Sequence, residues 1–67
     1  MDIGRRLAKN LVRLREERGW SQEDLADASG LHRTYVSGVE RGIRNPTIKV
    51  LERMAKALKV SAGALIE

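Results

Sequence analysis

The chain contains no cysteine and a single histidine among its 67 residues. Without thiols it can form neither a disulfide framework nor a thiolate metal site. One histidine also excludes the common zinc arrangements that use several imidazoles. Phenylalanine is absent as well, so the core must be built from leucine, isoleucine, valine and alanine side chains. We therefore expect a small domain without metal or cofactor.

Long apolar segments are missing too. No run approaches the roughly 18 apolar residues of a membrane span, and the amino terminus has no apolar signal region. No nucleophile–base set and no glycine-rich phosphate loop can be recognised, so we expect no enzymatic activity. These absences predict a cytoplasmic protein with no membrane partner. The net charge of +4 favours a polyanionic partner such as nucleic acid.

Helical periodicity dominates what is present. Apolar residues of the first segment share one helical face, at Ile3, Leu7, Leu11 and Leu14. This spacing predicts a helix over about 3–18, ended by Gly19. Ser21 and Asp24 form a capping box that begins a short second helix, which must end before Gly30.

Three further helices complete the chain. Residues 33–41 form one. Pro46 disfavours helix in the residues before it, and Thr47 caps the helix that follows. Ser61 caps the last helix. No segment alternates apolar and polar residues for long enough to indicate a strand. The sequence thus predicts one all-α domain of five short helices over residues 1–67.

Two short helices joined by a glycine-containing turn define a helix-turn-helix unit over about residues 21–41. The turn Ser29–Leu31 contains Gly30, which suits a left-handed position. In such units the amino-terminal part of the second helix enters the DNA major groove. A helical wheel puts Val36 and Val39 inside, which predicts that the opposite side faces solvent; that side carries Thr34, Ser37, Gly38 and Arg41.

The outward residues predict how DNA would be bound. We expect base contacts from Arg33, Thr34 and Ser37, because arginine can bind guanine edges and hydroxyls can donate or accept. Gly38 would let the helix backbone approach DNA closely; alternatively, Gly38 packs near another helix and His32 simply caps. The expected contacts with the DNA backbone are Ser21, Gln22, His32, Tyr35, Gly38, Arg41, Arg44 and Asn45.

Several of these contacts have alternatives. Gln22 could instead brace Arg33 or be an ordinary exposed residue. Tyr35 could pack on the flank of its helix rather than place its hydroxyl on a phosphate. Arg44 could lie in the flanking minor groove.

Glu40 lies at the edge of the apolar face, where a carboxylate needs a partner. Arg15 occupies the corresponding flank of the first helix, so we predict a shielded ion pair between them. The alternative is two independent surface charges worth less than about 1 kcal/mol.

The stretch LREERGWSQEDLADASGLHRTYVSGVERGIRNPTIKVLERMAKALKVS resembles the Cro and phage-repressor (Xre) type of helix-turn-helix protein. The resemblance covers about residues 4–66 and implies a lambda-repressor-like fold of five helices. It also implies the internal pair Arg15–Glu40. Within that family, RTYVSGVERGIRNPTIKVLE is most similar to controller proteins of restriction–modification systems. The likeness implies base contacts by Arg33, Thr34 and Ser37, and backbone contacts by Tyr35, Arg44 and Asn45.

The resulting prediction is a dimeric transcriptional regulator that binds a palindromic operator in double-stranded DNA and controls its own gene and an endonuclease gene. RNA polymerase is a further candidate partner. We expect the homodimer interface at Val60, Leu65 and Ile66, because they form an apolar end. The alternatives are a Cro-like phage or plasmid repressor, or a protein-interaction (antidote) module that uses the face of residues 33–41.

Overall fold

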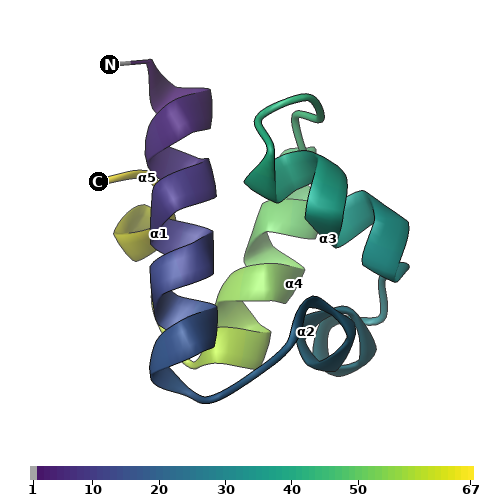
Figure 1. The fold of residues 1–67 in the computed structure, drawn as a ribbon. Coiled ribbons are helices and arrows are strands. Elements are labelled where there is room, and N and C mark those ends of the chain that lie inside the picture. Colours follow the sequence, from purple (N-terminus) through teal and green to yellow (C-terminus); the bar gives the residue numbers. More distant parts are fainter. Residues whose placement is uncertain (1) are drawn as a thin grey trace.

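Five helices and no strand make up residues 2–67, the part of the chain that the computed structural model describes (Figure 1). They are α1 (Ile3–Glu17), α2 (Gln22–Ser29), α3 (Arg33–Glu40), α4 (Ile48–Leu58) and α5 (Ala62–Ile66). Each lies within two residues of its predicted position. The all-α expectation is confirmed. None of these helices is long and apolar enough to cross a membrane.

Side-chain caps fix where four of the helices begin. Asp2 accepts a hydrogen bond from the Arg5 amide at 2.9 Å, and Thr47 and Ser61 cap α4 and α5 in the same way. Ser21 and Asp24 form the predicted capping box, with distances of 2.9 and 3.0 Å. These bonds satisfy amides that a helix start leaves unpaired, which is why short segments hold defined ends.

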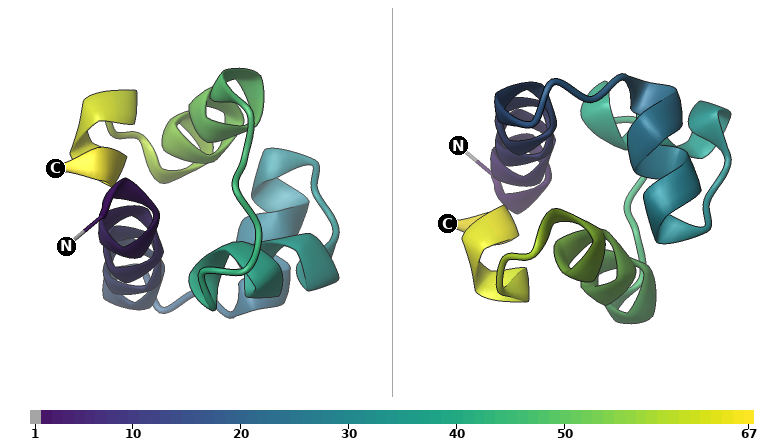
Figure 2. Two further views of the ribbon diagram at one scale, coloured as in Figure 1. Left: turned by 90° about the horizontal axis from the view of Figure 1, so that it is seen from above. Right: turned by 90° about the horizontal axis from the view of Figure 1, so that it is seen from below.

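The helices surround one core. Along the ring of packed neighbours the order is α1, α5, α4, α2 and α3, and α3 closes the ring against α1 (Figure 2). The largest fully buried side chains come from all five helices: Leu11, Leu25, Val36, Val39, Met54, Leu58 and Leu65. Burying a side chain of this kind stabilises the fold by about 1.5–3 kcal/mol, so shared packing holds helices too short to persist alone.

The turn between α2 and α3 sets the angle of the helix-turn-helix unit. Gly30 has a φ of 72°, in the left-handed region, and the Leu31 amide donates to the Ala26 carbonyl at 2.8 Å. Arg53 from α4 donates to the carbonyls of Ser29 (3.1 Å) and Gly30 (2.7 Å). Leu31 packs against the core. The turn is thereby fixed from both its inner and its outer side.

Candidate nucleic-acid interface

The orientation of α3 follows from its two valines. Val36 and Val39 are 0% and 1% exposed. On the other side Arg33, Thr34 and Arg41 are exposed and Ser37 is half-buried. We call these four residues the α3 outer face. The predicted orientation is therefore confirmed for Thr34, Ser37 and Arg41, and exposed Arg33 adds a second guanidinium at the start of the helix.

Gly38 corrects the sequence-based expectation. It is buried rather than open to solvent. A Cβ built at this position would lie 2.9 Å from both Cγ and Cδ of Arg44, so the arginine stem covers the glycine. The prediction that Gly38 faces outward was wrong, because the wheel describes a single helix and cannot include the loop that folds back over it.

The loop after α3 brings Arg44 to this position. Gly42 has a φ of 76°, which turns the chain, and the amides of Ile43 and Arg44 both donate to the Gly38 carbonyl, at 3.0 and 3.2 Å. The Arg44 guanidinium carbon lies 5.6 Å from the centre of the Tyr35 ring. Arg44 is exposed beside the α3 outer face, as the sequence predicted for this loop, and the neighbouring Asn45 is exposed as well.

Tyr35 takes the position on the flank of α3 that the sequence left as one alternative. It is half-buried and packs against the core cluster. One ring face meets Arg44, a cation–π contact worth about 0.5–1 kcal/mol at an exposed site. The ring therefore links the core to the loop that carries Arg44.

The start of α3 differs from the other helix starts in residues 2–67. Its N-cap residue, His32, makes no side-chain hydrogen bond to the helix, whereas the N-cap residues of the other four helices do. The capping role suggested as an alternative for His32 is thus wrong. Amides at an uncapped helix start, with exposed Arg33 beside them, suit an anion such as a phosphate.

Arg15 and Glu40 anchor the other end of α3. Arg15 donates from Nε to Glu40 Oε2 at 2.7 Å and from Nη2 to Oε1 at 3.1 Å, and its Nη1 reaches the Trp20 carbonyl at 2.7 Å. The two side chains are 13% and 5% exposed. The predicted shielded pair is confirmed. The hydrogen bond to Glu40 raises the pKa of Arg15 above its usual value, so the guanidinium stays charged.

Gln22 belongs to the same network. Its side-chain amide donates to Glu40 Oε1 at 2.9 Å, and the residue is half-buried. The alternatives in which Gln22 braces Arg33 or is an ordinary exposed residue are therefore wrong. The amide instead joins the start of α2 to the end of α3, while Ser21 remains exposed in its capping box.

The structure also changes the expected apolar end of the molecule. Leu65 is 0% exposed inside the core, so its assignment to a dimer interface was wrong. Sequence periodicity could not show that α5 turns this side chain between α1 and α4. Val60 and Ile66 are half-buried. Among residues 2–67, the most exposed large apolar side chain is Ile48, at 85%.

Two arginines with structural roles were missed by the sequence analysis. Arg53 clamps the turn, and Arg18 donates to the carbonyls of Leu14 and Leu58 at the ends of α1 and α4. No local signal marks either residue, because each role depends on where a distant helix ends.

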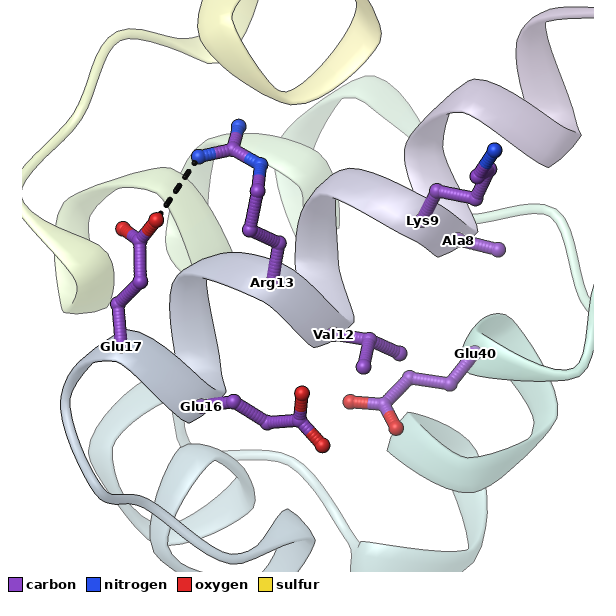
Figure 3. A pocket seen from close by; sticks show the side chains of 7 residues that line it. All are labelled: Ala8, Lys9, Val12, Arg13, Glu16, Glu17 and Glu40. Atoms are coloured by element: carbon purple, nitrogen blue, oxygen red, sulfur yellow. Dashed lines mark hydrogen bonds and ion pairs between the residues drawn. The ribbon is translucent and has the colours of Figure 1, made fainter.

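A surface hollow lies away from the α3 outer face. Its volume is about 610 Å³, and it runs along α1 over Ala8 and Val12, with Glu40 at its edge (Figure 3). Within residues 2–67, no group of three acidic, histidine or cysteine side chains could hold a metal ion. Exposed arginines also lie on α1, at Arg5, Arg6 and Arg13, so α3 is distinguished by the combination of Arg33 and Arg41 with the hydroxyls of Thr34 and Ser37.

Comparisons with known proteins agree with this geometry. Residues 11–65 match the model of the helix-turn-helix family. The control protein C.SmaI of Serratia marcescens is 48% identical over 66 residues, which cover 98% of this chain and 79% of the relative. The crystal structure of a hypothetical transcription factor from Neisseria has a TM-score of 0.95 at 47% identity, covering 98% of this chain and 76% of that one.

A third relative was solved with DNA. The restriction–modification controller protein C.Esp1396I, a tetramer in complex with its natural 35-base-pair operator, has a TM-score of 0.87 at 43% identity and covers 97% of this chain and 86% of that one. The fold, the α3 geometry and these similarities lead to one conclusion: the chain belongs to the Xre-type helix-turn-helix family.

Proposed function

We propose that the protein is a sequence-specific DNA-binding transcriptional regulator of the restriction–modification controller type. The observation that carries the proposal is the α3 outer face, where exposed Arg33 and Thr34 stand at an uncapped helix start. Its relatives include the control protein C.SmaI and a controller protein solved on its operator. The protein acts by binding, and no residue in the proposal has a catalytic role.

Contacts divide between bases and backbone. Arg33, Thr34 and Ser37 would meet base edges in the major groove, because they project from the first turns of α3. Arg41, at the end of this face, and residues around the face would hold phosphates or sugars. The surrounding residues are Ser21, Gln22, His32, Tyr35, Arg44 and Asn45. Gly38 leaves this set, since the Arg44 stem covers it.

We further propose a two-fold homodimer on a palindromic operator. The exposed side chain of Ile48 lies one helical turn before Leu51, which lines a shallow hollow of about 190 Å³ together with Ile3 and Ile66. A second copy would cover this apolar surface, with Ile48 and Ile66 in the interface and Leu65 outside it. The dimer must place two α3 helices about 34–36 Å apart to meet successive turns of one DNA face.

The regulated genes follow from the proposed controller type. The dimer would act in the cytoplasm on its own gene and on the endonuclease gene. RNA polymerase becomes a partner where the operator adjoins the promoter without covering it, and it is excluded where the two overlap. The position of the operator relative to the promoter therefore determines whether the protein activates or represses transcription.

Titration of fluorescent DNA fragments from upstream of the protein's own gene tests the proposal. We expect preference for one fragment over its shuffled sequence, and a log–log salt slope of about −0.9 for each neutralised phosphate. Sedimentation of the protein and of an Ile48→Glu variant tests the dimer, which the charge should disrupt. Weak, salt-independent binding without preference would refute the DNA-binding proposal. An unchanged dimer in the variant would refute only the interface.

A further inference from the structure

Gly38 has an unusual environment for a glycine inside a helix. It lies within α3 but is covered by a side chain from outside that helix, the stem of Arg44. An added Cβ would lie 2.9 Å from both Cγ and Cδ of that arginine, closer than real Cβ contacts come. Because Cγ is near the root of the side chain, the whole arginine would have to swing away. The stem of Arg44 therefore occupies the space that a side chain at position 38 would fill. We call this space the Gly38 notch.

The rest of Arg44 is held on both sides of this notch. Its amide and that of Ile43 donate to the carbonyl of Gly38, which fixes the root of the side chain. Its guanidinium lies over the Tyr35 ring at 5.6 Å, which orients the charged end. The ring itself packs against the core. Main chain, notch and ring together select one path for a side chain that otherwise has many rotamers.

We propose that Gly38 is a positioning residue that holds Arg44 in a DNA-contacting conformation before DNA arrives. The inference rests on the proposed function, and it gives Gly38 a role different from close approach of the helix backbone to DNA. Ordering a long side chain on binding lowers affinity, and an arginine ordered beforehand avoids this loss, an effect of about three- to tenfold.

The two roles of Gly38 predict different couplings to Arg44. If Gly38 acts by positioning Arg44, Gly38→Ala weakens DNA binding only by displacing that arginine. It should then cause no further loss of affinity in a protein that already carries Arg44→Ala. If Gly38 instead lets the helix backbone approach DNA closely, the added methyl group weakens binding whichever residue is present at position 44. A double-mutant cycle separates these cases.

The experiment measures affinity for the preferred upstream fragment at one salt concentration. We expect Gly38→Ala to weaken binding about three- to tenfold, and Arg44→Ala to weaken it at least as much. The double variant should bind within about twofold of Arg44→Ala alone. An equal effect of Gly38→Ala in both backgrounds, or no effect in the wild-type background, would overturn the inference.

Gly63→Ala is the matched control. Gly63 also lies within a helix, but a Cβ there meets only Ser61 Oγ, at an ordinary 3.8 Å. The affinity of Gly63→Ala for the preferred DNA fragment should equal that of the wild type. Thermal unfolding of each variant checks the fold, and Gly38→Ala should be no less stable because alanine favours helix over glycine.

A measurement without DNA keeps the inference separate from the proposed function. In the free protein, nuclear Overhauser effects should connect the α protons of Gly38 to the γ and δ protons of Arg44. In Gly38→Ala, the effects between residue 38 and these protons should be absent. If these effects are absent from the free wild-type protein, the inference is overturned, even when the protein is shown to bind DNA. Their presence in a protein that binds no DNA would instead refute the proposed function.

Discussion

The two ends of α3 are built in opposite ways. At its carboxyl end, Glu40 accepts hydrogen bonds from Arg15 and Gln22, so three helices meet at one shielded carboxylate. At its amino end, His32 provides no side-chain cap, and Arg33 and Thr34 are exposed. One end is joined to the rest of the fold, while the other presents polar groups to solvent.

This difference shows how a very short helix can combine a fixed orientation with an incomplete end. Arginine near a helix start is unfavourable by about 0.3–1 kcal/mol, because the dipole is positive there. The packing of Val36 and Val39 and the Glu40 network offset that cost. The free protein can then keep amides and a guanidinium that a polyanion would satisfy.

The largest expected effect comes from breaking the anchored end. Arg15→Ala leaves Glu40 shielded with only the Gln22 amide, so we expect a loss of about 3–5 kcal/mol in the free energy of unfolding. Urea or thermal unfolding measures it. The matched control is Arg13→Ala, which removes a surface pair with Glu17 whose side chains are 54% and 55% exposed (Figure 3). That change should cost less than about 0.5 kcal/mol.

A paired variant sharpens the first prediction. Arg15→Met with Glu40→Leu removes both charges, so unfolding free energy should recover to within about 1–2 kcal/mol of the wild type. If Arg15→Ala were no more destabilising than Arg13→Ala, the end of α3 would not be anchored by this pair.

The exposed end should show its effect in binding rather than stability. Arg33→Ala is expected to reduce discrimination between operator and random DNA by about 1–3 kcal/mol. The variant should be no less stable than the wild type, because the helix dipole disfavours a cation at this position. Titration of both DNAs measures the difference. Arg6→Ala removes the same charge from an exposed site on α1 and is the control, with discrimination retained. Equal losses in the two variants would assign Arg33 to general electrostatics.

Arg44→Ala should give a smaller change in discrimination than Arg33→Ala. We expect weaker binding to all sequences and a salt slope lower in magnitude by about 1, because a phosphate contact carries no base information. Titrations of both DNAs at several salt concentrations measure it. Selective loss on the operator alone would instead make Arg44 a base-reading residue.

The smallest effect is expected from completing the open end. His32 has a φ of −88° and a ψ of 146°, the extended geometry of a capping residue. His32→Asp should therefore stabilise the fold by about 0.5–1 kcal/mol and also weaken DNA binding, since the carboxylate would occupy amides and repel phosphate. Unfolding and titration report the two opposite changes. Stabilisation without weaker binding would remove this helix start from the interface.

Local patterns were sufficient where the determining groups are close in sequence. The spacing of Leu7, Leu11 and Leu14 predicted α1, and Ser21 with Asp24 predicted the start of α2. Arg15–Glu40 was also predictable, because two helical wheels each left a charge on an apolar flank. Residue roles that depend on packing against another helix or loop were missed or misjudged, as at Gly38, Leu65 and Gln22.

The sequence by itself determined the five helices, the inward valines of α3 and the family, since periodicity, caps and motif residues act within a few turns of chain. Only the tertiary structure decided that Arg44 fills the space at Gly38, that Arg53 clamps the turn and that Leu65 belongs to the core. The first depends on how the loop after α3 folds back onto the helix, and the other two depend on how helices far apart in the chain pack together. No local spacing encodes either arrangement.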